Sequence, residues 1–328
     1  MLTDRVTDRR NEKPRDGRAT LADPAMRPNF LIIGAAKSGT TALWHYLRQH
    51  PQIYMSPRKH TRFFAFEVEE PGFRGPGPRN PSVPYAITDI EAYHKLFEGV
   101  TNETAIGEAS HSYLYRPEAP ERIQRYAPDM KLIAVLRNPV DRANSHFNQM
   151  IRDGREPLDD FARSLEEEEG RIRDHWWPDF HYVQIGLYHT QLERYFDLFK
   201  RGQIKVYLYE DFGSTPYGVL RDIFGFLGVD DTFVPRAAVR YNASGIPKNK
   251  TLHLSLQRLR QARPIIERFV PERFCRSLLR IGGNLHNRNL TKPQLTPEVR
   301  RRATDEYFRE DIIKLQDLIQ RDLSGWLK

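Results

Sequence analysis

The segment that most restricts how this chain can fold is a strand, a loop and a helix in direct succession over residues 28–43. Residues 30–33 form an apolar run of strand length with two β-branched side chains. Gly34 and Gly39 then bracket a short loop, and helical spacing begins at Thr41. Such a loop directs free backbone N–H groups and a helix N-terminus at one point, which makes an anion site, usually for phosphate.

The position of the lysine distinguishes this loop from the loop of nucleoside-triphosphate hydrolases. In those proteins the lysine follows the second glycine, whereas here Lys37 comes before Gly39. Ser38, Thr40 and Thr41 supply small hydroxyl side chains around it. We therefore predict a loop that holds a 5′-phosphate group, with its lysine on the opposite side. The alternative is an ordinary turn between a strand and a helix, in which the same residue types are common.

Composition limits the compartment and the partners. The chain of 328 residues is 39% hydrophobic, enough for a substantial core. It lacks an apolar run of about 18 residues, and its N-terminus is charged, so we expect neither a membrane span nor a secretory signal. The single cysteine, Cys275, excludes an internal disulfide and favours a reducing, cytoplasmic location. The net charge of +8 favours an anionic ligand; a nucleic acid is not expected, because no recognised binding motif occurs.

Strand-like and helical segments alternate from residue 28 onward. The strongest strand patterns cover residues 30–33, 104–108, 131–136 and 204–209. Helical patterns cover residues 41–48, 89–97, 117–126, 139–151, 158–169, 187–199, 216–227 and 307–326. Asp89 is a candidate N-cap, and the four glutamates at residues 166–169 are expected to form a solvated face of their helix. This order predicts an α/β, P-loop-like fold in three layers, with a central, mainly parallel sheet flanked by helices. We expect a disordered leader over residues 1–25 and a single domain over residues 26–328.

A second candidate phosphate site follows the strand pattern at residues 131–136. A triphosphate hydrolase would be expected to carry an aspartate for Mg²⁺ at such a strand end. This strand ends in Arg137 instead, and Ser145 comes eight residues later in the next helix. An arginine and a serine can bind phosphate without a metal. Singly, the two residues also fit an ion pair at the surface and a plain helix position.

Taken together, the two motifs resemble the sulfotransferases that use 3′-phosphoadenosine 5′-phosphosulfate (PAPS), over about residues 28–325. The order of elements is most similar to the branch of heparan-sulfate-type and bacterial small-molecule enzymes. The resemblance implies PAPS as co-substrate, adenosine 3′,5′-bisphosphate as product, and no metal. It also implies which residues bind: the 5′-phosphosulfate would contact Lys37, Ser38, Gly39, Thr40 and Thr41, and the 3′-phosphate would contact Arg137 and Ser145.

The resemblance also suggests the catalytic groups. A K-E-x-x-F-F motif supplies a glutamate base in that branch, and here the matching segment, residues 59–64, has His60 in the glutamate's place. We expect His60 to be the base, because a histidine titrates near working pH, and Lys37 to stabilise charge on the bridging oxygen. Glu108 matches the glutamate of the family's G-E-x-[ST]-P-x-Y segment and is the alternative base or an orienting group. His111 replaces the proline of that segment.

The C-terminal region offers a weaker match. Arg288 and Lys292 occupy the region where many family members close a basic loop over the nucleotide, but the usual Lys-Gly-Arg triplet is absent. A generic basic surface loop is the alternative. The expected acceptor is a hydroxyl or amine of a small molecule or a glycan. Aromatic candidates for its pocket are Phe63, Phe64, Phe66, Trp176, Trp177 and Tyr182.

Two other classes of protein compete with this interpretation. A P-loop nucleotide kinase or NTPase would depend on Mg²⁺ and would place an aspartate where Arg137 stands. A non-catalytic polyanion-binding protein would rely on the arginine-rich residues 257–302, and its affinity would fall steeply with salt. The sequence gives neither the acceptor nor the oligomeric state.

Overall fold

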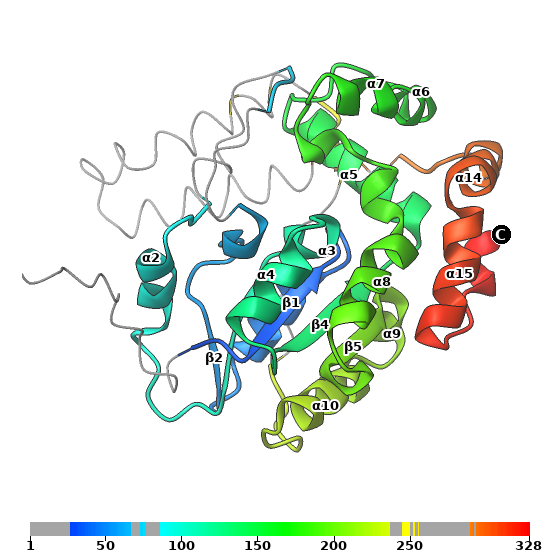
Figure 1. The fold of residues 1–328 in the computed structure, drawn as a ribbon. Helices are drawn as coiled ribbons and strands as arrows, with labels where there is room; N and C mark the ends of the chain where they lie inside the picture. The colour runs from blue at the N-terminus through cyan, green and yellow to red at the C-terminus, as the bar shows by residue number, and fades with distance from the viewer. Residues whose placement is uncertain are drawn as a thin grey trace, which may run out of the picture.

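A five-stranded parallel sheet forms the centre of the protein (Figure 1), with the strand order β2-β3-β1-β4-β5. The strands are β1 (Phe30–Gly34), β2 (Ile53–Met55), β3 (Ala105–Ala109), β4 (Lys131–Leu136) and β5 (Ile204–Leu208). The computed structural model describes residues 27–66, 73–76, 86–236, 245–249, 252, 255, 289–291 and 293–328. The expected α/β architecture is confirmed. The expected leader over residues 1–25 lies outside the described residues.

Helices cover both faces of the sheet. The larger ones are α1 (Thr40–Leu47), α4 (Ala119–Tyr126), α5 (Pro139–Arg152), α8 (Tyr188–Leu198), α10 (Pro216–Leu227) and α15 (Arg309–Ile319). The shorter ones are α2 (Ile90–His94), α3 (Ser112–Tyr115), α6 (Phe161–Glu166), α7 (Glu168–Arg173), α9 (Tyr209–Ser214) and α14 (Pro297–Ala303). A second, two-stranded antiparallel sheet pairs β6 (Ile246–Pro247) with β7 (Leu290–Thr291).

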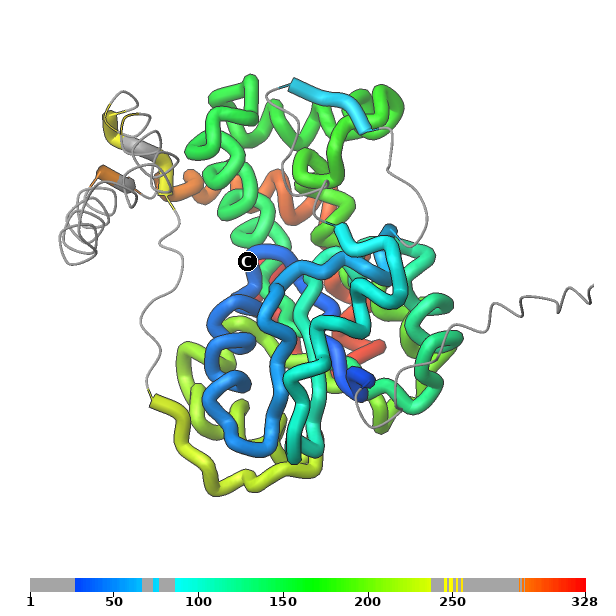
Figure 2. The backbone as a smooth tube through the Cα atoms, turned by 90° about the vertical axis from the view of Figure 1, so that its left-hand side faces the viewer, coloured from blue at the N-terminus to red at the C-terminus, as the bar shows by residue number. Residues whose placement is uncertain are grey.

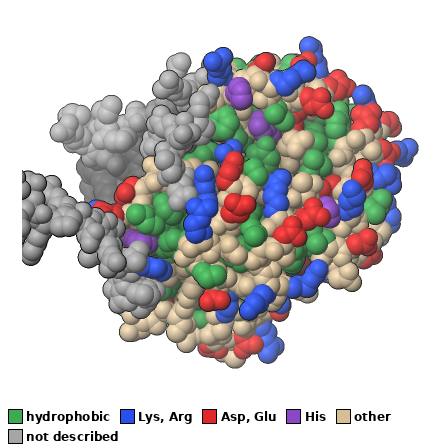
Figure 3. Space-filling model, viewed as in Figure 1, with side chains coloured by type: hydrophobic (Ala, Val, Ile, Leu, Met, Phe, Trp, Pro, Cys, Tyr) green, Lys and Arg blue, Asp and Glu red, His purple; other side chains and the backbone are tan. Residues whose placement is uncertain are grey.

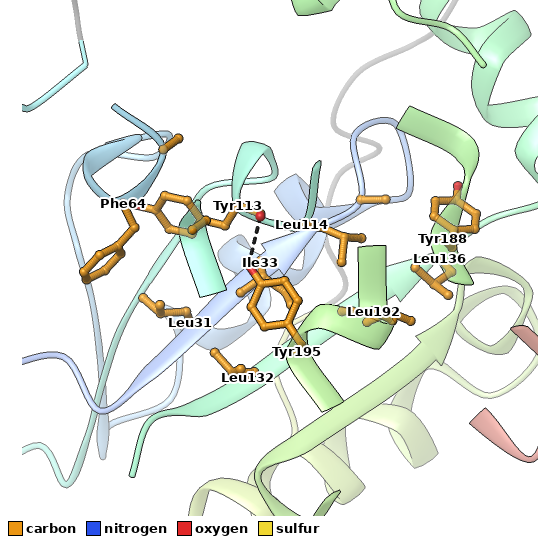
Figure 4. Close-up of a cluster of buried hydrophobic side chains, with 14 of the residues drawn as sticks. Leu31, Ile33, Phe64, Tyr113, Leu114, Leu132, Leu136, Tyr188, Leu192 and Tyr195 are labelled. Carbon is orange, nitrogen blue, oxygen red and sulfur yellow. Dashed lines mark hydrogen bonds between the residues drawn. The ribbon is translucent and has the colours of Figure 1, made fainter. Parts of the chain in front are cut away.

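The three layers follow from the alternation of side chains along each strand. Phe30 and Ile32 of β1 share one buried cluster with the apolar faces of α1 and α10. Leu31 and Ile33 point the other way, into a larger cluster with residues of α4, α5, α8 and α15 (Figure 4). A strand buried on both faces reads as a continuous apolar run, which is why the sequence identified β1 and β4 so clearly.

The strand order brings the two candidate phosphate loops to the same edge of the sheet. β1 lies between β3 and β4, and Phe30 aligns with Gly107 on one side and with Lys131 on the other. Because all these strands are parallel, the loop after β1 and the residues after β4 leave the sheet side by side. Ligands of open α/β sheets bind at this carboxyl edge.

The helix pattern at residues 158–169 folds differently from the expectation of one helix with a solvated acidic face. It forms two short helices, α6 and α7, and Glu168 is only 2% exposed. The carboxylate of Glu168 accepts backbone N–H bonds from Val183 at 2.6 Å and Gln184 at 2.8 Å. The expectation was wrong for Glu168 because its side chain fixes a distant turn, and burial raises its pKa to about 7.

The C-terminal helices return to the body of the domain. In Figures 1 and 2, α14 and α15 are coloured orange to red, and α15 packs along α8. The expected helix over residues 307–326 instead ends at Ile319, followed by Gln320 with a φ of 55°. Among the helices in the described part of the chain, none has the length and apolarity needed to cross a membrane.

The close contact between β1 and β3 predicts a stability effect at Gly107. A Cβ at this position would lie 2.5 and 2.6 Å from two ring atoms of Phe30, which is itself fully buried. We expect Gly107→Ala to lower the free energy of unfolding by about 1–3 kcal/mol in urea denaturation, because the core would be overpacked. Gly225→Ala is the matched control: the site is open, and we expect a gain of about 0.5–1 kcal/mol in helix α10. Equal effects of the two substitutions would contradict this packing account.

Candidate functional site

The loop after β1 presents backbone N–H groups at the start of α1. Gly39 is the N-cap residue and has a φ of 90°, a conformation that favours glycine. The first turn of α1, Thr40 to Leu43, carries only uncharged side chains. The N–H groups of a first turn have no intrahelical acceptor, so they are available to an anion.

Lys37 stands in this loop and connects it to α5. Its ammonium donates a hydrogen bond to Oε1 of Gln149 at 2.7 Å. Ser145 lies one helical turn before Gln149, so both residues occupy the same face of α5, and Ser145 is 7% exposed. Lys37 therefore contacts the face of α5 that also carries Ser145.

Arg137 joins the two strand ends directly. Its guanidinium donates a hydrogen bond to the backbone carbonyl of Lys37 at 3.4 Å. The same guanidinium lies 4.9 Å from the ring centroid of Tyr209, which begins α9 after β5. A Cβ on Gly39 would meet that ring at 3.3 Å. Tyr209, 43% exposed, is a site neighbour that the sequence analysis did not identify.

Lys59 is a second lysine at the loop, and the sequence analysis missed it as a site residue. Its ammonium donates to the hydroxyl of Thr41 at 2.5 Å and to that of Thr40 at 3.3 Å. Burial, and then repulsion from Lys37, lower the pKa of Lys59 to about 7. Burial, and then repulsion from the nearby Arg152, lower the pKa of Lys37 to about 8. A bound anion would raise the pKa values of both lysines.

Two histidines lie at the carboxyl end of β3, next to these lysines. The rings of His60 and His111 meet edge to face, with centroids 4.5 Å apart. The backbone N–H of His60 donates to the carbonyl of Ala109 at 2.9 Å, which holds the two segments together. Burial lowers the pKa of both imidazoles well below 6.5, and neighbouring cations lower it further, so both are neutral at neutral pH.

Glu108, the alternative base, is enclosed by hydroxyl groups. It is fully buried and accepts hydrogen bonds from the hydroxyls of Ser110 at 2.9 Å and Tyr113 at 2.5 Å. Burial raises its pKa to about 7. The carboxylate therefore holds residues on both sides of His111 in the sequence.

A cleft opens beside the loop after β1 and His111. Its lining residues are Ala36, Arg62, Phe66, His111, Ser112, Tyr115, Arg116, His146, Trp177, Pro178, Asp179 and Ile185. Of the six aromatic residues predicted for a pocket, Phe66 and Trp177 belong to this lining. Phe63 and Phe64 pack instead in the core around Tyr93.

The predicted basic residues of the C-terminal region, Arg288 and Lys292, lie outside the described residues. The segment between them contains β7, which pairs with β6, and β6 lies against α5. The C-terminal region thus reaches the helix that carries Ser145. Within the described ranges, the structure contains no cluster of three or more His, Cys, Asp or Glu side chains that could hold a metal ion.

Comparison with known proteins agrees with this geometry. The family model described as "Sulfotransferase family" matches residues 28–233, which include both strand-end motifs. The chain belongs to the sulfotransferase family. The crystal structure of a sulfotransferase from Alicyclobacillus acidocaldarius is similar with a TM-score of 0.70 and 37% identity, covering 92% of this chain and 99% of that one.

Two mouse proteins show the relation to curated sulfotransferases. The bifunctional heparan sulfate N-deacetylase/N-sulfotransferase 4 is 31% identical over 215 residues, which cover 62% of this chain and 22% of the relative. Heparan sulfate glucosamine 3-O-sulfotransferase 3B1 is 30% identical over 203 residues, which cover 62% of this chain and 46% of the relative. This sulfotransferase-family chain therefore spans less than half of the length of either relative.

The two lysines with lowered pKa values predict proton uptake on ligand binding. Near pH 7.5 Lys59 is mostly neutral and Lys37 partly neutral, and the phosphates of adenosine 3′,5′-bisphosphate would raise both pKa values. We expect uptake on the order of one proton per ligand. Calorimetry in buffers of different ionisation enthalpy measures it. Lys59→Met should remove the larger share, and binding without any proton uptake in the unmodified protein would contradict the prediction.

Proposed function

We propose that this protein transfers a sulfuryl group from PAPS to a hydroxyl or amine of a small-molecule or glycan acceptor. The observation that carries the proposal is the hydrogen bond from Arg137 to the carbonyl of Lys37. It brings together the residues that would bind the two phosphate groups, one set at each strand end, and so supports the binding of a single nucleotide. Family membership supports the same activity.

In this proposal, each end of the nucleotide has its own partners. Backbone N–H groups of residues 38–41 hold the 5′-phosphate at the start of α1. Arg137 and Ser145 hold the 3′-phosphate, and the exposed ring of Tyr209 lies between these two positions. Arg288 and Lys292 are candidates to cover the nucleotide, because the segment between them reaches α5.

Transfer would then be an in-line displacement at sulfur, in which the protein mainly positions groups and stabilises charge. The acceptor oxygen forms a new bond to sulfur while the bond from sulfur to the bridging oxygen breaks. The electron pair of the broken bond stays on the 5′-phosphate, where Lys37 neutralises the charge that develops. Lys59, bonded to the hydroxyls of Thr40 and Thr41, is a second cation at this position.

A neutral histidine next to the loop after β1 would take the proton of the acceptor. His111 lines the cleft, and His60, the base expected from the sequence, stacks edge-on against its ring. We therefore assign the proton transfer to this pair, with His111 facing the acceptor. Glu108 acts as a positioning residue through Ser110, which directly precedes His111.

A thermal-shift comparison tests the nucleotide assignment against a kinase or NTPase. With EDTA present, adenosine 3′,5′-bisphosphate at about a hundredfold excess over its Kd should stabilise the protein by about 2.7 kcal/mol. ATP with Mg²⁺ should stabilise it less, since β4 ends in an arginine instead of a metal-binding aspartate. Greater stabilisation by ATP with Mg²⁺ would overturn the proposal.

The same assay tests a polyanion-binding role. Figure 3 shows basic and acidic side chains interspersed on the face seen in Figure 1. Several basic side chains have acidic partners, such as Arg302 with Glu166 and Lys314 with Glu310. A simple polyanion site would bind heparin or nucleic acid with a steep salt dependence and would not prefer a 3′-phosphate. We expect a clear preference for adenosine 3′,5′-bisphosphate over adenosine 5′-monophosphate.

Substitution of the two histidines tests the assignment of the base. We expect His111→Ala to lower kcat about 10²–10⁴-fold, because proton transfer is lost, while the Kd for adenosine 3′,5′-bisphosphate stays within a few-fold. His60→Ala should cause a smaller loss. His189→Gln, whose ring lies 4.0 Å from the carboxylate of Glu193 on α8, is the matched control and should leave both values unchanged. Near-normal turnover by His111→Ala would move the role to His60.

A further inference from the structure

The cleft beside His111 is mostly apolar, and this bears on which acceptor the protein takes. Three aromatic side chains form much of its wall: Phe66, Tyr115 and Trp177. Ala36, Pro178 and Ile185 add aliphatic surface.

Charged groups of the cleft already have partners within the protein. The guanidinium of Arg116 lies 5.0 Å from the ring centroid of Phe66 and 3.4 Å from the carboxylate of Glu118. The carboxylate of Asp179 accepts a hydrogen bond from Arg155 at 2.9 Å. The lining also includes Arg62, which like Arg116 would attract an anion, so the cost to a polyanionic chain is the lost hydration of its charges and not repulsion.

The neutral polar side chains of the lining are those of His111, Ser112, Tyr115 and His146. Tyr115 and His181 satisfy each other through a hydrogen bond of 2.6 Å. The hydroxyl of Ser112 is buried and, within the part of the chain that the structure describes, lacks a hydrogen-bond partner. Ser112 is adjacent to His111 in the wall. One hydroxyl group of a ligand can therefore be bound here, next to the base.

A sugar chain would be a poor match to such a wall. Each pyranose ring carries several hydroxyl groups, and each of them loses its bonds to water on entry without a polar partner to replace them. A flat apolar ring avoids this cost and gains contact with the aromatic wall. A molecule with one hydroxyl at the end of an aromatic body would place that group at Ser112 and His111.

We infer that the acceptor is an aryl alcohol with a compact apolar body, and not a heparan-type oligosaccharide. The inference rests on the proposed function and narrows its acceptor. The inferred acceptor differs from the heparan sulfate that appears in the names of the two mouse relatives. The reaction is then formation of an aryl sulfate ester: the phenolic oxygen bonds to sulfur, its proton goes to His111, and the nucleotide leaves as adenosine 3′,5′-bisphosphate.

The test is an acceptor panel with the full-length chain and PAPS, with release of adenosine 3′,5′-bisphosphate as the readout. Phenol, 2-naphthol and a monohydroxyflavone represent one to three rings, and a heparosan octasaccharide represents the glycan class. We expect turnover with at least one aryl alcohol and a kcat/KM at least tenfold lower with the octasaccharide. Absence of turnover with all three aryl alcohols, or a preference for the octasaccharide, would overturn the inference.

A thermal-shift measurement of adenosine 3′,5′-bisphosphate binding to the same samples distinguishes failure of the acceptor inference from failure of the proposed function. If the nucleotide stabilises the protein but the aryl alcohols are not sulfated, the acceptor inference fails and the proposed function stands. If the nucleotide gives no stabilisation and no acceptor is sulfated, the proposed function itself fails.

Two neighbouring tryptophans provide a matched pair of variants. Trp177 lines the cleft, whereas Trp176 packs on Arg171 and Phe180 outside it. We expect Trp177→Leu to raise KM for the best aryl alcohol about tenfold with little change in kcat, because aromatic contact is lost. Trp176→Leu should leave KM unchanged. Phe66→Leu is a second cleft variant with the same expected effect, and an unchanged KM in both cleft variants would contradict the inference.

Discussion

The contact between the guanidinium of Arg137 and the carbonyl of Lys37 is the interaction on which the site depends. It joins the ends of two adjacent parallel strands, β1 and β4, that are 100 residues apart in sequence. Parallel pairing makes this possible, because both strands end at the same edge of the sheet. The β1 loop then needs Gly39, and α5 must begin at once after β4, so that Lys37 can reach Gln149.

This arrangement gathers positive charge that the protein alone does not neutralise. Lys37 and Lys59 lie together at the loop with lowered pKa values, and Arg137 stands beside them. The cost of holding these cations close is recovered when an anion with more than one phosphate group binds. The neighbouring imidazoles stay neutral in the same field.

Much of the fold could be predicted from local patterns. The strand at residues 131–136 and the helix at residues 216–227 have the bounds that the sequence predicted, and Asp89 caps α2 as expected, accepting the N–H of Ala92 at 2.7 Å. These features depend on short-range spacing. Short-range spacing could not predict which of the glutamates at residues 166–169 is buried, because the burial of Glu168 depends on a turn 15 residues further along.

The proximity of Lys37 and Arg137 was predictable, because a motif places each of them directly at a strand end. Lys59 was missed because it follows β2, at the sheet edge, and reaches the β1 loop only through the folded strand order. The motif that drew attention to His60 contains Lys59, so the signal was present. The division of roles between Glu108 and His111 depends on burial, which the sequence pattern does not show.

The most direct test of the central claim is a crystal structure with bound adenosine 3′,5′-bisphosphate. The account predicts one nucleotide across the two strand ends, with its 5′-phosphate against the N–H groups at the start of α1 and its 3′-phosphate within hydrogen-bond distance of Arg137 and Ser145. A nucleotide bound with its 3′-phosphate away from Arg137, or bound in another cavity, would contradict it.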